Sequence, residues 1–435
     1  MSPRLSSYYK QREPSSIRKA QISYRSRLDI SEVGVINLAI GNVSLPMHPA
    51  MIARAKNLLS ENSPFKNGVV RYSSSEGTKE CADAIIQSIS AELTVDMSKD
   101  IHCVITDGGS QAMELMLLGI CDPLSDKTIL FIDPLYTNYN EFSKRLSISS
   151  VSFYRSFNDD GFFSEIDITL LRKQVEENKP NGILVIPSDN PTGQQISRKS
   201  IIEIAQLCVE KDIWLISDEA YRNIYFTKNG PTSIWDISKE DVPEIVGRRI
   251  SIESVSKVWN ACGLRIGALV TDNKDMYKKV RSEYTANLCA NVIGQYIFSS
   301  VANLNSTEIV SWYNSQRNYY LKIIDELVLG FRKVLPGLII SKPQAAIYIV
   351  LDFKNIVPIS FNISDFIEYC ASYGRCNIDS KIYTLLLAPM TGFYSDSNTG
   401  SKQARIALVE PEDKMKIVPE LLSKLLDSFM LYQKS

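Results

Sequence analysis

The stretch "SIESVSKVWNACGLRIGALV", residues 251–270, joins two apolar runs through a loop that carries one lysine and one arginine. The runs "RISIE" (249–253) and "ALVT" (268–271) are nearly continuous in hydrophobic residues, which is typical of strands in a sheet covered on both faces. Between them, Lys257 follows the first strand and Arg265 comes eight positions later. This stretch therefore predicts two buried strands with cationic side chains at their ends.

The loop around Lys257 favours a reactive amine over an ordinary surface lysine. A lone lysine near a strand end more often extends along the surface to water. Here the neighbours include Ser256, Val258 and Trp259, which predict a partly buried site. Burial disfavours the ammonium form and leaves the amine more available as a nucleophile. Arg265 stays charged and can hold a phosphate with several N–H donors, and the glycines on either side of it leave room for a ligand.

The chain before this stretch alternates short apolar runs with amphipathic segments. The segment "SRKSIIEIAQLCVEKD" (197–212) has the spacing of a helix and begins with a serine suited to capping it. Such alternation predicts an α/β domain with a mostly parallel sheet flanked by helices. The other predicted strands are "HCVIT" (102–106), "TILFI" (128–132), "GILVIP" (182–187) and "WLISD" (214–218).

The pattern changes after residue 305. A long helical pattern over 306–335 is followed by short strands and helices to the end of the chain. We therefore expect a large domain at 46–305 and a smaller α+β domain at 306–435. The N-terminal segment, 1–45, is expected to contribute to the small domain and to contacts between subunits. Short strands mixed with helices are also compatible with one larger domain.

The composition excludes several classes of protein. With 48 basic and 49 acidic residues the net charge is −1, so nothing indicates nucleic acid or an acidic membrane surface as a partner. No apolar run reaches the ~18 residues of a membrane span, and the N-terminus lacks the apolar core of a secretory signal. The eight cysteines form no C-x-x-C pair and are read as reduced thiols of a cytoplasmic protein. Only two histidines are present, which argues against a metal site or a Ser–His–Asp triad.

Polar residues directly after the predicted strands are the candidates for a binding site, because sheets of this kind bind ligands beyond the carboxyl ends of their strands. After 102–106, Gly109 and Ser110 open a helix whose N-terminus suits an anion, although such a turn is more often only structural. After 128–132, Tyr136 is either a core residue or a platform for a flat ring.

Three more polar residues follow the next two strands. Asn190 opens "NPTG" (190–193), where an asparagine usually serves only the turn but can also donate a hydrogen bond to a ligand. Asp218 begins "DEAY" (218–221) and is either a helix cap, an exposed loop carboxylate, or a buried carboxylate that holds a proton on a ring nitrogen. Tyr221 lies within reach of the same pocket.

Together these residues describe a ligand with a phosphate, a flat ring with a basic nitrogen, a ring oxygen and a carbonyl that a lysine can attack. Pyridoxal phosphate has all four features, and we predict it as the cofactor. In this order the motifs resemble those of the class I and II aminotransferases, the fold type I pyridoxal-phosphate enzymes of aspartate-aminotransferase type. The resemblance covers nearly the whole chain and is strongest in "SVSKVWNACGLRIG" (254–267), "NPTG" and "DEAY".

The resemblance implies a role for each candidate residue. Lys257 would join the cofactor and move protons on the substrate carbon, while Asp218 pairs with the pyridine nitrogen and Tyr221 with the ring oxygen. Tyr72 would reach the phosphate in the neighbouring subunit, which implies a homodimer with shared active sites. The other implied cofactor contacts are Gly109, Ser110, Tyr136, Asn190, Ser254 and Arg265.

Substrate contacts are implied for Arg405, which matches the arginine that binds the substrate carboxylate, for Asn190 beside it, and for Gly41 in the segment that closes over the substrate. Asn287 takes the place of an arginine that would read a side-chain carboxylate, which argues against a dicarboxylate substrate. We therefore predict an aminotransferase that moves an amino group between an amino acid and a 2-oxo acid by a ping-pong mechanism. The alternatives on this scaffold are a lyase, a decarboxylase or a cyclase, and a non-catalytic protein.

Overall fold

The computed structural model describes residues 3–93 and 101–434 and divides the chain into two compact units. The large unit comprises Asn42–Ile324 and Ser341–Ile349. The small unit comprises the residues up to Gly41, Asp325–Ile340 and the residues from Val350 onward. Helix α11 (Ser306–Val334) contributes residues to both units. The domain boundaries predicted at residues 45 and 305 stay predictions, because compactness alone does not define a part that folds by itself.

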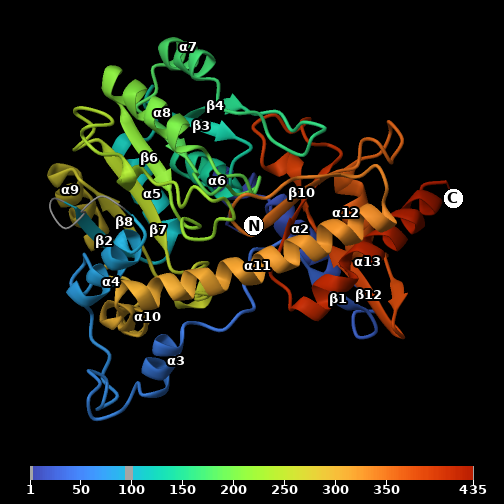
Figure 1. Ribbon diagram of the computed structural model, residues 1–435, viewed down its shortest axis with the longest axis horizontal. Helices are drawn as coiled ribbons and strands as arrows, with labels where there is room; N and C mark the ends of the chain where they lie inside the picture. Colours follow the sequence, from blue (N-terminus) through green and yellow to red (C-terminus); the bar gives the residue numbers. More distant parts are fainter. Residues whose placement is uncertain (1–2, 94–100, 435) are drawn as a thin grey trace. The chain divides into compact units, whose positions relative to one another are not determined.

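The large unit is built on a seven-stranded sheet in the order β2-β8-β7-β6-β5-β3-β4 (Figure 1). Strand β8 runs antiparallel to both of its neighbours, and the pairs among the other strands are parallel. Most residues of these strands are buried, as the continuous apolar runs predicted. The bounds are β2 His102–Thr106, β3 Thr128–Asp133, β4 Ser149–Tyr154, β5 Gly182–Val185, β6 Trp214–Asp218, β7 Arg249–Ser254 and β8 Gly267–Thr271.

Helices flank this sheet because each has one apolar face to bury. Helix α5 packs on β7 and β8, α4 on β2, and α8 on β6 (Figure 1). The Ser197 hydroxyl caps α8 by accepting from the backbone N–H of Ser200, as expected from the sequence. The helices are α3 Pro49–Lys56, α4 Lys79–Ser90, α5 Gly109–Ile120, α6 Thr137–Leu146, α7 Ile168–Asn178, α8 Arg198–Glu210, α9 Lys274–Tyr284 and α10 Val292–Phe298.

The small unit holds two smaller sheets. One has the order β1-β12-β11, with β1 and β12 parallel. The other has the order β13-β14-β10-β9, in which β10 begins in the large unit. The strands are β1 Gly34–Asn37, β9 Ile339–Ile340, β10 Tyr348–Asp352, β11 Cys376–Ile378, β12 Lys381–Leu386, β13 Ala388–Pro389 and β14 Gln403–Ala407; the helices are α1 Ser7–Lys10, α2 Ser16–Arg25, α12 Ile363–Ser372 and α13 Glu412–Tyr432.

These elements confirm the predicted fold class. Each strand expected in the large domain is present, and β4 is an addition there that the sequence did not reveal. In the small unit, β1, β9 and β11 are further additions. All eight cysteines are free thiols. Over residues 3–93 and 101–434, no helix is both long enough and apolar enough to cross a membrane.

Three strand ends meet in one row of the large sheet. Thr106 at the end of β2 pairs with Gly267 at the start of β8, which pairs in turn with Ser254 at the end of β7. A Cβ atom on Gly267 would lie 2.4 Å from the backbone nitrogen of Gly109 and 2.5 Å from the carbonyl carbon of Gly108. Both are backbone atoms, so only glycine lets β8 begin directly against the turn that opens α5.

We predict that Gly267→Ala destabilises the protein by about 1–3 kcal/mol, because the added methyl group forces the Gly108–Gly109 turn away from β8. The matched control is Gly263→Ala, where a Cβ atom would meet no other atom within 4 Å. Thermal unfolding should give a lower midpoint for Gly267→Ala and an unchanged midpoint for Gly263→Ala. Equal midpoints for the two variants would contradict the close approach.

Candidate active site

The strand order places the predicted cofactor residues other than Tyr72 next to one another along one edge of the large sheet. At this edge the parallel strands end, and the antiparallel β8 begins. Open α/β sheets bind ligands at this edge. From β2 towards β3, the residues are Gly109 and Ser110 after β2, Arg265 before β8, Ser254 and Lys257 at the end of β7, Asp218 and Tyr221 at the end of β6, Asn190 after β5 and Tyr136 after β3.

An anion cradle lies at the β2–β8 end of this edge. Helix α5 begins at Gly109, and no side chain caps its first N–H groups. Gly108 precedes it with a φ of 76°, and a Cβ atom there would lie 2.3 Å from a guanidinium nitrogen of Arg265. The Arg265 guanidinium donates to the carbonyl oxygens of Asp107 (3.3 Å) and Cys262 (3.2 Å). Backbone N–H donors and a guanidinium thus lie close enough together to bind one anion, such as a phosphate.

Lys257 is half-buried in the turn that follows β7. Its Nζ lies 3.9 Å from Sγ of Cys262 and donates to it. Asn260 fixes the turn, because its side-chain amide donates to the carbonyl oxygen of Pro46 and to Oε1 of Gln316 in α11, each at 3.0 Å. The lysine is therefore carried by a fixed turn rather than by a surface loop, as its apolar neighbours predicted.

Asp218 is buried, with 5% of its surface exposed, at the end of β6. The hydroxyl of Tyr139 donates to Oδ2 at 2.8 Å, and the backbone N–H of Ala220 donates to Oδ1 at 3.1 Å. Burial raises the pKa of Asp218 to about 6, although both hydrogen bonds favour the ionised form. No lysine or arginine within the described part of the chain forms an ion pair with it. This carboxylate is suited to receive a cation from a ligand.

Tyr139 was not among the predicted site residues. It lies one turn into α6, fully buried, and its ring packs against the core. Tyr136, three positions earlier, is the N-cap residue of α6 and is half-buried. The spacing of three places both side chains on one side of α6 and is the only signal from which Tyr139 could have been inferred.

Asn190 is buried in a turn that a polar network supports. The backbone N–H of Gly193 donates to the carbonyl oxygen of Asp189 at 3.0 Å, which closes the turn around Asn190. Below it, Arg155 lies 3.5 Å from the Asp189 carboxylate and donates to Oε1 of Gln194 at 3.1 Å. Burial outweighs the attraction of Arg155 and raises the pKa of Asp189 to about 7. The motif at 190–193 thus forms a turn that buried polar side chains stabilise.

Tyr221 is buried, and its hydroxyl lies 2.5 Å from the hydroxyl of Tyr348. Tyr348 belongs to the segment Ser341–Ile349, which is part of the large unit although the preceding residues, Asp325–Ile340, are part of the small unit. The backbone N–H groups of Gln344 and Ala345 donate to the carbonyl oxygen of Gly193, which fixes this segment beside the turn of Asn190. Tyr348 is a second residue that local sequence patterns did not identify.

The remaining predicted residues do not belong to this row of strand ends. Tyr72 is in the large unit with 77% of its surface exposed. Arg405 and Gly41 belong to the small unit, where the guanidinium of the buried Arg405 donates to the carbonyl oxygen of Ala39, two residues before Gly41. The Arg405 guanidinium also lies 4.9 Å from the centre of the Phe393 ring.

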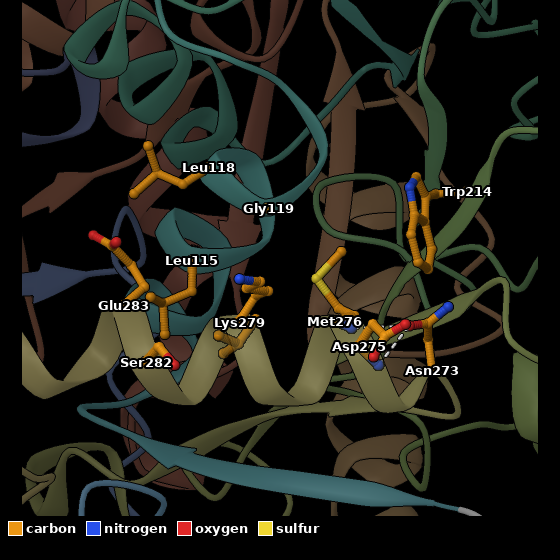
Figure 2. Close-up of a pocket in the computed structure, with 11 residues that line it drawn as sticks. Leu115, Leu118, Gly119, Trp214, Asn273, Asp275, Met276, Lys279, Ser282 and Glu283 are labelled. Carbon is orange, nitrogen blue, oxygen red and sulfur yellow. Dashed lines mark hydrogen bonds between the residues drawn. The ribbon is translucent and has the colours of Figure 1, made fainter.

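A pocket of about 670 Å³ lies between α5 and α9 in the large unit. Figure 2 shows Trp214, Met276 and Lys279 among the residues that line it. Trp214 begins β6, whereas Asp218 ends that strand, so this pocket lies at the opposite edge of the sheet from the candidate active site. It gathers none of the predicted cofactor residues.

With this geometry in place, comparison with known proteins defines the class. The family model described as "Aminotransferase class I and II" matches residues 33–379. The chain therefore belongs to this family and is a transaminase, as the sequence motifs predicted.

Named relatives agree with this assignment. The aspartate aminotransferase of Thermotoga maritima is 24% identical over 325 residues, which cover 74% of this chain and 78% of that protein. Alanine aminotransferase 2 of Panicum miliaceum is 25% identical over an alignment that covers 87% of this chain and 80% of that protein. The solved structure of N-succinyldiaminopimelate aminotransferase from Mycobacterium tuberculosis matches with a TM-score of 0.80 and 18% identity over 97% of this chain and 100% of that chain, and it shows the same fold.

The pKa of Asp218 predicts how stability depends on pH in protein without added cofactor. Because the folded pKa of about 6 exceeds the ordinary value of 3.8, this residue's contribution to stability is fully present below about pH 4 and is lost as the pH rises through about 6. Asp218→Asn removes this contribution. We expect the stability of Asp218→Asn relative to the wild type to rise between about pH 4 and pH 7 by roughly 3 kcal/mol.

Urea unfolding of both proteins at the two pH values measures this difference. The comparison cancels the effect of Asp189, which titrates in both proteins. A difference that does not change with pH, or that falls, would show that Asp218 is not a desolvated carboxyl.

Proposed function

We propose that this protein transfers amino groups between amino acids and 2-oxo acids with pyridoxal 5'-phosphate as its cofactor. The observation that carries the proposal is the order of groups along one sheet edge: an anion cradle, then a lysine, then a buried carboxylate. Pyridoxal phosphate has the matching order of a phosphate, a carbonyl and a basic ring nitrogen. Its phosphate would be held by the N-terminus of α5, Ser110, Ser254 and Arg265.

The ring end fits the residues that the structure brings together. No described lysine or arginine forms an ion pair with Asp218, and a protonated ring nitrogen would supply the missing positive charge. This charge would lower the pKa of Asp218 again. Tyr139 would keep that carboxylate oriented through its 2.8 Å hydrogen bond. Tyr221 and Asn190 would donate to the ring oxygen, and Tyr136 would lie against the ring face.

When bound, pyridoxal phosphate supplies a ring that accepts the electron pair left on the substrate carbon as its proton leaves. Lys257 would transfer this proton: its Nζ would take the proton from the substrate carbon and later donate it on the side of the cofactor. The position of Lys257 in the turn directly after β7 favours this role, because it lies between the anion cradle and Asp218 along the sheet edge. The buried surroundings would also limit access of water to the reacting carbon.

The substrate carboxylate is assigned to Arg405, with Asn190 and the segment around Gly41 as further contacts. Arg405 suits this task because a guanidinium binds a carboxylate with two parallel N–H donors. The side chain of the substrate is not expected to be a second carboxylate, since Asn287 is exposed and uncharged where an arginine was expected. The named relatives act on aspartate, alanine and N-succinyldiaminopimelate, so their names do not select one donor. They favour transamination over elimination, decarboxylation or cyclisation.

We propose a homodimer in which Tyr72 reaches the phosphate of the neighbouring subunit. Tyr72, Val69 and Val70 are each more than half exposed and lie within four positions of the chain. An exposed apolar run of this kind is what a subunit interface buries. A cytoplasmic location is proposed from the eight free thiols.

The test is to identify the residue that carries the cofactor. Protein incubated with pyridoxal phosphate is reduced with borohydride, digested and mapped by mass spectrometry. We expect the cofactor mass on Lys257 in the wild type and no retained cofactor in Lys257→Ala. Lys279→Ala, which changes a lysine of the α5–α9 pocket, is the matched control and should bind as the wild type does. Labelling of another lysine, or none, would contradict the proposed site.

The reaction is tested separately, with amino donors screened against 2-oxoglutarate, pyruvate and oxaloacetate. Ping-pong transfer for at least one pair is expected. Loaded enzyme that transfers no amino group but releases ammonia or carbon dioxide would replace the proposal by a lyase or a decarboxylase.

A further inference from the structure

Cys262 stands out among the eight cysteines. Five of them are buried: Cys81, Cys121, Cys208, Cys370 and Cys376. Cys262 is partly exposed, so a small oxidant can reach it. Among the residues that the structure describes, it is the cysteine whose sulfur accepts a hydrogen bond from a lysine amine.

The two reactive groups come from one short loop. Nζ of Lys257 lies 3.9 Å from Sγ of Cys262, and the Cys262 thiol donates to the carbonyl oxygen of Ser256 at 2.9 Å. The Asn260 contacts to Pro46 and Gln316 hold the intervening residues in place. Contact between sulfur and nitrogen therefore requires only a small rotation of the flexible lysine side chain.

A buried hydroxyl lies near enough to Cys262 for the two groups to interact electrostatically. Tyr320 of α11 is fully buried, and its hydroxyl has no hydrogen-bond partner within residues 3–93 and 101–434. Burial raises its pKa well above the ordinary value, and the nearby Tyr319, Cys262 and Tyr348 raise it further. Such a donor is costly to leave unsatisfied. An oxygen atom added to the Cys262 sulfur would place a further acceptor in the neighbourhood of this unsatisfied donor.

We propose that Lys257 and Cys262 form an oxidation-sensitive pair that a peroxide converts into a covalent S–N link. In the first step the Cys262 thiol is oxidised by two electrons: the peroxide O–O bond breaks, one oxygen stays on sulfur as a sulfenic acid, and the other leaves as water. In the second step the Lys257 amine attacks this sulfur, the S–O bond breaks, and a second water leaves with one amine hydrogen. A thiol reductant reverses the link and restores both side chains as it becomes a disulfide.

The link would switch off cofactor attachment, because it consumes the amine that joins the cofactor. This consequence rests on the proposed function, whereas the cross-link itself does not. Bound pyridoxal phosphate would in turn protect Lys257, so the cofactor-free enzyme is the sensitive form.

The experiment treats the protein with hydrogen peroxide, with and without prior loading with pyridoxal phosphate. Chymotrypsin then cuts after Trp259, so peptides that contain Lys257 and Cys262 stay together only if they are joined. Mass spectrometry without reductant should find this pair, lighter by two hydrogen atoms than the sum of the separate peptides. The pair should be lost after loading, after reductant and in Cys262→Ser. Cys289→Ser, which changes another partly exposed cysteine, should keep it.

The variant Lys257→Arg separates the two steps, since it keeps a cation but loses the amine. It should accumulate a Cys262 sulfenic acid that dimedone traps. A disulfide of Cys262, further oxidation of Cys262 beside an intact Lys257, or no change in the loop would each overturn the proposal. A cross-link that forms equally well after loading would uphold the pair and contradict the proposed cofactor site instead.

Discussion

The candidate active site depends on the close approach of β8 to the turn that opens α5. Gly267 lies against the backbone of Gly108 and Gly109, and its partners in the sheet are the last residues of β2 and β7. This contact sets the N-terminus of α5 beside Arg265 and beside the loop of Lys257. A larger residue at position 267 would separate the anion cradle from the lysine, and the proposed cofactor would have to span the two.

Burial shapes the chemistry at the other end of the site. Asp218 and Asp189 are both buried, and both have a raised pKa even though hydrogen bonds, and for Asp189 an arginine, favour ionisation. Asp189 is tied into the support of its own turn, whereas Asp218 faces the candidate site with Tyr139 as its side-chain donor. The protein thus keeps a desolvated carboxylate whose negative charge is best stabilised by a ligand. At the middle of the site, the loop that carries both residues places the Lys257 amine 3.9 Å from the Cys262 sulfur.

Much of this could be predicted from the sequence. Continuous apolar runs predict the buried strands. The motifs around Lys257, Asp218 and Asn190 lie at the ends of these strands, where local patterns identify them. Tyr139, Tyr348 and the Cys262–Lys257 contact could not be found this way. Tyr139 reaches Asp218 across 79 positions of the chain, and Tyr348 reaches Tyr221 across 127. Such pairs depend on strand order and on the return of Ser341–Ile349, which no local pattern encodes.

The most direct test of the central claim is an experimentally determined structure of the protein with pyridoxal phosphate. The phosphate should lie between the first N–H groups of α5 and the Arg265 guanidinium, the ring nitrogen should face Asp218, and the ring should be joined to Lys257. A cofactor bound in the α5–α9 pocket, or one whose phosphate lies away from Gly109 and Arg265, would contradict the account.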